Sequence, residues 1–123
     1  MNIDLKGMLA SHVNDPRMGA VAFEALRIIG QFPATSEHVS TQRIPPKQVA
    51  EIWKRRLSMG FLKKEAICGI EETISSLSKL RSDVLFGYVE TPSGFVGVWF
   101  LDEQSGPVGI IAGDSTKVSC VSE

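Results

Sequence analysis

The sequence predicts an α+β protein in which about four N-terminal helices pack on a C-terminal antiparallel meander of three to four strands. Three observations lead to this prediction. Apolar residues recur at helical spacing through much of residues 1–81. Residues 84–123 instead contain runs of β-branched and aromatic residues between turn-forming residues. No repeat or low-complexity tract divides the 123 residues, so we expect one domain, 1–123, with a helical part over 1–81 and a β-meander over 84–123.

Two helices are predicted before residue 31. Apolar spacing places the first from about Leu5 to Val13, with His12 on its apolar face. Asp15 is suited to the N-cap of the second helix and Pro16 to its first turn. Gly30 is expected to end that helix. Its apolar stripe is regular: Met18, Val21, Ala22, Ala25, Leu26 and Ile29.

Residues 31–45 show no periodicity, and a loop of that length is unusual inside a compact domain. A short strand at Val39-Ser40-Thr41 is an alternative that the sequence leaves open. After Pro45-Pro46 the pattern predicts a third helix that ends near Gly60, and then a fourth helix over about 62–80.

Strands are predicted over 84–90, 95–101 and 108–111, with 117–121 as a candidate fourth strand. The turn Thr91-Pro92-Ser93-Gly94 suggests a three-residue hairpin loop, which would pair Thr91 with Phe95 and place Gly87 opposite Trp99. In that register both faces of the hairpin are apolar. One face would hold Leu85, Val89, Phe95, Trp99 and Leu101, and the other Phe86, Tyr88, Val96, Val98 and Phe100.

The second apolar face leads to a functional hypothesis. An exposed aromatic patch is typical of a protein-binding surface, so Trp99, Leu85 and Val89 are candidate partner-binding residues. The alternative is that helices cover both faces and that Trp99 belongs to an ordinary core.

Charge divides unevenly along the chain, although the formal net charge is only −1. Residues 1–82 hold twelve Lys and Arg against eight Asp and Glu, whereas residues 83–123 hold one against six. The acidic turns with Asp102, Glu103 and Asp114 are expected to steer a basic protein partner. The alternative is a nucleic-acid-associated regulator that contacts phosphates through Lys54, Arg55, Arg56, Lys63 and Lys64. It ranks second because Glu71 and Glu72 would repel DNA and the near-neutral net charge is unusual for a polyanion binder.

No pattern of residues indicates catalysis, a cofactor or a metal. His12, His38, Cys68 and Cys120 come from separate segments without the paired spacing of metal ligands. Glycine pairs occur, but no phosphate-binding fingerprint does. We therefore expect no enzyme activity, cofactor or metal. An unrecognised active site around His12 or Cys68 remains the alternative, because convergent sites need not leave local motifs.

The sequence shows no secretory signal and no apolar run of about 18 residues that would span a bilayer. Two cysteines without a disulfide framework fit a reducing compartment. These observations predict a cytoplasmic protein. The apolar sheet face and the acidic turns lead us to expect a small protein-binding module. Its size and α+β layout resemble those of toxin-neutralising immunity proteins, which implies an inhibitor of a basic bacterial toxin or effector. A homodimer formed through a sheet edge is a further expectation.

Overall fold

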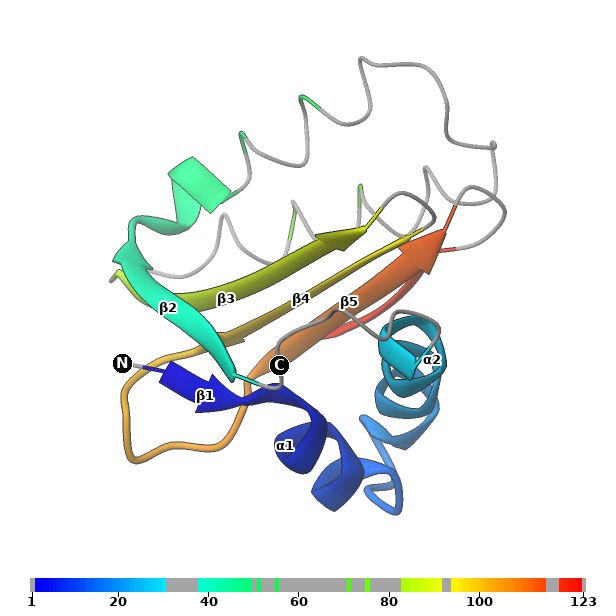
Figure 1. The fold of residues 1–123 in the computed structure, drawn as a ribbon. Helices are drawn as coiled ribbons and strands as arrows, with labels where there is room; N and C mark the ends of the chain where they lie inside the picture. The colour runs from blue at the N-terminus through cyan, green and yellow to red at the C-terminus, as the bar shows by residue number, and fades with distance from the viewer. Residues whose placement is uncertain are drawn as a thin grey trace.

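The computed structural model describes residues 2–30, 38–49, 51, 55, 71, 75, 83–91, 94–114 and 118–122 (Figure 1). Two helices, α1 (Leu5–His12) and α2 (Gly19–Gly30), lie together on one side of a sheet. All strands of that sheet are antiparallel, and their spatial order equals their order in the chain. They are β1 (Asn2–Asp4), β2 (His38–Ile44), β3 (Val84–Thr91), β4 (Gly94–Phe100), β5 (Gly109–Asp114) and β6 (Val118–Ser122).

The predicted proportions of helix and sheet are wrong. Instead of about four helices on a three- to four-stranded meander, strands β2 to β6 form a continuous five-stranded sheet, which β1 extends. Within the described ranges only α1 and α2 reach eight residues. The predicted third and fourth helices fall mostly outside the described residues, although residues 46–49, 51, 55, 71 and 75 are helical.

The structure decides the alternative left open at Val39-Ser40-Thr41 in favour of a strand, and β2 extends beyond those three residues at both ends. The sequence did not settle this because the segment lacks an apolar alternation. The segment has only two aliphatic residues, Val39 and Ile44, which are five positions apart in the sequence and so do not follow the period of two of a half-buried strand. The strand is held instead by pairing on both sides, with β1 and with β3. Thr41 pairs with Gly87 in this ladder and is itself buried. Backbone pairing of this kind leaves no hydrophobic period in the sequence.

Both predicted N-terminal helices are confirmed, although α2 starts at Gly19, a few residues after the predicted Asp15-Pro16 start. Asp4 caps α1, because its carboxylate accepts a hydrogen bond from the Gly7 amide at 3.1 Å. The Asp15 carboxylate accepts from the amides of Arg17 at 2.7 Å and Met18 at 3.1 Å, just before α2. The predicted stripes face the sheet, where the buried residues are Leu5, Leu9, Met18, Val21, Ala22, Ala25, Ile28 and Ile29.

The β3–β4 hairpin has a register one residue away from the predicted one. Thr91 pairs with Gly94 rather than with Phe95, so the loop has two residues instead of three. Gly94 is glycine for a reason of packing: a Cβ there would lie 2.8 Å from Ile28 Cγ2 on α2 and 2.9 Å from the Gly113 carbonyl oxygen. It is part of the ladder, and the prediction had placed it in the turn.

A shift of one residue moves every side chain of β3 to the other face relative to β4. Two buried clusters result, one on each side of the sheet, which confirms that both faces are apolar. The cluster under α1 and α2 includes Leu85, Val96, Val98, Phe100, Ile110 and Ala112. The opposite cluster contains Val49, Val84, Phe86, Phe95, Trp99, Val108, Ile111 and Val118.

Candidate functional site

The predicted aromatic surface is not assembled. Trp99 is only 1% exposed and lies in the cluster on the sheet face away from α1 and α2. Leu85 is 5% exposed and lies on the opposite face, under the helices, where Val89 packs half-buried against the same cluster. The three side chains therefore share no surface, and Trp99 offers no indole to a partner in this structure.

Trp99 has a different relation to the surface, because it holds the base of a loop. It pairs with Gly109 on β5, where a Cβ would lie 2.1 Å from the indole Cε2 and Cζ2 atoms. A glycine does make room for the indole, as expected, but it is Gly109 and not Gly87. The Val108 amide donates to the Trp99 carbonyl oxygen at 2.9 Å, which closes the base of the connection between β4 and β5.

The connection carries six consecutive exposed residues, Leu101–Gly106, which we call the acidic loop. Asp102 organises it, because its Oδ1 accepts hydrogen bonds from the amides of Gln104 at 2.9 Å and Ser105 at 2.7 Å. The hydrogen bond from the Ser105 side chain, followed by those two amides and the charge of Arg43, holds the pKa of Asp102 below its ordinary value. Asp102 is thus ionised at neutral pH, in a loop with a defined shape.

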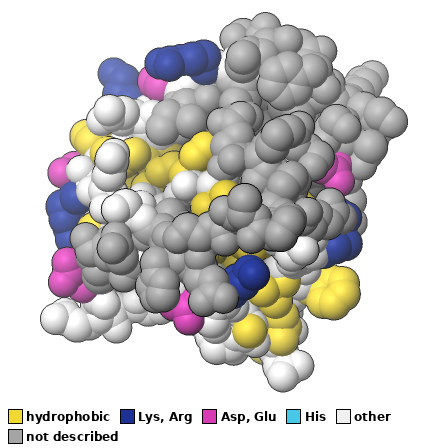
Figure 2. Space-filling model, in the orientation of Figure 1, with side chains coloured by type: hydrophobic (Ala, Val, Ile, Leu, Met, Phe, Trp, Pro, Cys, Tyr) yellow, Lys and Arg dark blue, Asp and Glu magenta, His cyan; other side chains and the backbone are white. Residues whose placement is uncertain are grey.

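Other charged groups lie at the same end of the sheet. Because Leu85 pairs with Phe100, the start of β3 is beside the end of β4. Exposed Asp83 directly precedes β3, and the acidic loop directly follows β4, so both lie at this end of the sheet. Arg43 on β2 donates to the Asp83 carbonyl oxygen at 3.4 Å. Acidic and basic side chains alternate along the left margin of Figure 2, where β2 and the acidic loop lie in Figure 1.

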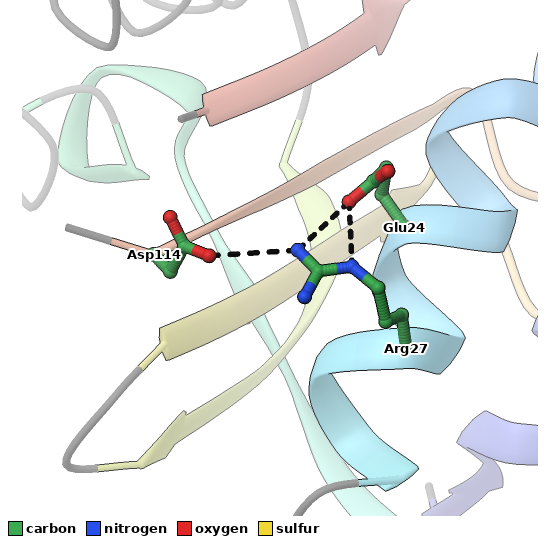
Figure 3. A network of polar contacts seen from close by, with 3 residues as sticks. All are labelled: Glu24, Arg27 and Asp114. Atoms are coloured by element: carbon green, nitrogen blue, oxygen red, sulfur yellow. Dashed lines mark hydrogen bonds and ion pairs between the residues drawn. The ribbon is translucent and has the colours of Figure 1, made fainter. Parts of the chain in front are cut away.

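Asp114 does not join the acidic loop. It pairs with Gly94 at the opposite end of β4 and β5, beyond the full length of the strands. Arg27 on α2 lies between two carboxylates there (Figure 3), with Nη2 2.9 Å from Glu24 Oε2 and 3.4 Å from Asp114 Oδ2. The hydrogen bond with Glu24, and then that with Asp114, raises the pKa of Arg27. Asp114 is thus engaged in an ion pair within the chain, with Arg27 shared between it and Glu24.

No family model, curated protein or solved structure matches this chain.

The candidate nucleic-acid segment falls almost wholly outside the described residues. Of its five cations only Arg55 is described. It is a helical residue, and it is exposed. Lys54, Arg56, Lys63 and Lys64 lie outside the described residues.

The residues considered for chemistry are not brought together. His12 is half-exposed at the end of α1, where its Nδ1 lies 2.8 Å from the Met8 carbonyl oxygen and 3.0 Å from Ser11 Oγ. Cys120 is half-buried in β6, and Cys68 lies outside the described residues. Among the described ranges, no three His, Cys, Asp or Glu residues are grouped so as to hold a metal ion. None of the described helices is long and apolar enough to cross a membrane.

Four exposed residues were not among the candidate site residues predicted from the sequence: Leu101, Asp83, Arg43 and Phe23. Leu101 was assigned to an apolar strand face but is 42% exposed in the acidic loop. Asp83 and Arg43 lie at the same end of the sheet as the loop because of strand pairing, which leaves no local signal in the sequence. Phe23 is 62% exposed on α2, and its place off the apolar stripe was the available indication.

Proposed function

We propose that the protein is a small protein-binding module that recognises a basic protein through the acidic loop. The observation that carries the proposal is the joint presence of Leu101, Asp102 and Glu103, all exposed, in one hydrogen-bonded loop. Leu101 is one of two large apolar side chains that are exposed among the described residues. An apolar side chain beside charged groups is a common arrangement in specific protein interfaces.

The ordered state of the loop supports this proposal. Ordering a flexible loop on binding costs free energy, and the Asp102 hydrogen bonds have already ordered this one. The Trp99 carbonyl and Gly109 hold its base within the sheet. The same loop would repel phosphate groups, which disfavours nucleic acid as its ligand.

The expected partner surface is basic, with an apolar depression for Leu101. A non-enzymatic cytoplasmic inhibitor, of the immunity type that neutralises a bacterial toxin or effector, is the kind of protein that we propose here. Inhibitors of nucleases bind basic active-site clefts through complementary fields, and the acidic loop would supply the negative partner of such a pair.

Charge reversal tests the proposal. Immobilised wild-type protein and its Glu103→Lys variant are used to capture proteins from the source cells, and the association rate of each captured protein is then measured at low and high salt. Glu103 is suited to reversal because Asp102, and not Glu103, provides the hydrogen bonds that order the loop. We expect a basic partner whose association with Glu103→Lys is several-fold slower at low salt, with the difference reduced at high salt.

The matched control is Glu71→Lys, which makes the same change of charge at an exposed helical residue outside the loop. It should associate like wild type. Asp102→Asn keeps the side-chain oxygen acceptor and removes the charge, so it should also slow association. Equal association rates for wild type, Glu103→Lys and Asp102→Asn would refute the proposal. Retention of DNA in place of a protein at low salt would favour the nucleic-acid alternative.

A further inference from the structure

Strand β6 is one edge of the sheet, and its composition is unusual for an edge. Among the described strands it has a neighbour on one side only, β5. Soluble proteins commonly protect edge strands with charged residues, proline, bulges or very short length. The segment Val118–Ser122 contains no charged residue and no proline, and its ladder with β5 is continuous. The opposite edge, β1, has only three residues and ends in Asp4.

A shallow groove runs beside this edge. It has a volume of about 400 Å³ and lies between the N-terminal half of α2 and β6, lined by Ala20, Phe23 and Glu24 on the helix and Ser119 on the strand. Phe23 is 62% exposed at its rim. Hydrophobic side chains gather over α2 at the lower right of Figure 2.

We propose that a second copy of this chain pairs with β6, antiparallel to it, across a two-fold axis perpendicular to the sheet. Such an axis keeps the helices of both copies on the same side of a continuous sheet. It also pairs one residue of β6 with its own counterpart. If the axis passes between the two copies of Cys120, the central residue of β6, all five residues of the strand are paired. Any other position of the axis leaves some of them unpaired.

In that register Ser119 pairs with Val121 of the second copy. Both residues project to the α2 side of the sheet, because Ser119 lines the groove and Val121 packs against the cluster under the helices. Val121 of the second copy would then lie beside Phe23 and cover the groove. The contact is reciprocal, so both exposed phenylalanines are shielded at once.

The absence of charge on β6 favours a second copy as the occupant. Two identical charged strands would place like charges close together across the axis, whereas Val-Ser-Cys-Val-Ser pairs with itself without repulsion. Each copy brings the same uncharged edge and the same groove, and one interface protects both. This inference does not rest on the acidic loop.

The test is the molar mass in solution, measured by light scattering and sedimentation from low-micromolar to high-micromolar concentration. We expect wild type to approach twice the monomer mass of 13.4 kDa. Ser119→Lys places two cations beside the axis, and Phe23→Lys places a cation in the groove, so each should shift the protein to the monomer. The Phe23 side chain is exposed, so Phe23→Lys is expected to fold like wild type. Far-UV circular dichroism checks that both variants are folded.

The matched control is Leu101→Lys, which replaces the other exposed apolar side chain with lysine and should leave the dimer intact. Amide exchange in β6 should slow as wild-type concentration rises, and should not do so in Ser119→Lys. A wild-type monomer at every concentration would overturn the proposal. A wild-type dimer that persists in both Ser119→Lys and Phe23→Lys would also overturn it. Loop variants such as Glu103→Lys report on partner capture and should not change the mass, so the two proposals fail separately.

Discussion

Gly109 and Trp99 show how one residue pair connects the core to the surface. The indole occupies the space above Gly109 that any other side chain would need, and the carbonyl oxygen of Trp99 accepts the Val108 amide at the base of the acidic loop. The tryptophan that sequence analysis assigned to binding is therefore buried one step behind the exposed loop. Its carbonyl oxygen positions the loop, and its indole is buried in the core.

Replacement of Gly109 by alanine tests this arrangement. The added Cβ would lie 2.1 Å from two indole atoms, and the surrounding core leaves the ring little room to move. We expect a loss of about 1–3 kcal/mol in the free energy of unfolding, the usual cost of overpacking, measured by urea denaturation.

The matched control is Gly30→Ala at the end of α2, where a Cβ would meet no atom within 4 Å. Alanine is the better helix former, so this change should be neutral or stabilising by up to about 1 kcal/mol. Equal effects of the two substitutions would contradict the role assigned to Gly109.

At the scale of elements, α2 is held to the sheet by more than its apolar stripe. The Asp15 carboxylate caps the turn that leads into α2, where it accepts from the Arg17 and Met18 amides. Arg27 joins its C-terminal half to Asp114 on β5. The ion pair is solvent-exposed, so the stripe and the cap are expected to contribute most of the stability of this element.

The cap predicts a pH dependence. The Met18 amide, followed by the Arg17 amide, lowers the pKa of Asp15 below its ordinary value of 3.8. The ionised carboxylate therefore stabilises the folded state at every pH above the unfolded pKa, and that contribution is lost as the pH falls through the lower folded pKa. Asp15→Ala should accordingly lower the urea midpoint at neutral pH.

The comparison is between wild type and Asp15→Ala in urea titrations from about pH 7 down to about pH 2. The difference between their midpoints should shrink at the acid end, where wild type has lost the ionised cap. Asp15→Asn, which keeps an acceptor without a titrating charge, should reduce the acid sensitivity while it retains much of the neutral-pH stability. A constant difference at all pH values would show that the carboxylate charge has no part in the cap.

Elements with a regular apolar period were predictable from the sequence, and those held by pairing were not. The stripe from Met18 to Ile29 located α2, and runs such as Phe95–Leu101 located the C-terminal strands. Strand β2 has no such period. The hairpin register failed at Gly94, whose small size serves contact with Ile28 on an element 66 positions earlier in the chain. Local turn chemistry contains no information about such a contact.

The candidate site was predictable only in part, for the same reason. Asp102 and Glu103 were identified from charge alone, and both are exposed in the acidic loop. Asp114, equally acidic in the sequence, is matched by Arg27, 87 residues earlier. Trp99 and Leu85 were assigned to one surface because the register error placed them together, whereas the correct pairing separates them to the two sides of the sheet.

At the scale of the whole molecule, one sheet is shared by two cores. Strand β4 contributes Val96 and Val98 to the cluster under α1 and α2, and Phe95 and Trp99 to the opposite cluster. Neither cluster can lose its packing without disturbing strands that the other requires. We expect the two sides to unfold together as one cooperative unit.

Truncation on each side tests that cooperativity. Trp99→Ala should cost about 3–5 kcal/mol, and Leu9→Ala on the helical side about 2–5 kcal/mol. In both variants the slope of the unfolding free energy against denaturant concentration should equal that of wild type. Far-UV and near-UV circular dichroism should give coincident transitions. Separate transitions in either variant would mean that the clusters are independent.

The distance in sequence between α2 and the strands on which it packs has a consequence during synthesis. Arg27 must wait for Asp114, 87 residues later, before the contact that joins α2 to β5 can form. At about 5–20 residues per second, the ribosome takes on the order of 4–17 s to make that stretch. Until β4 and β5 have been made, the apolar side of the nascent helix lacks the strands that cover it in the fold, so we expect the unfinished chain to be a substrate for ribosome-associated chaperones.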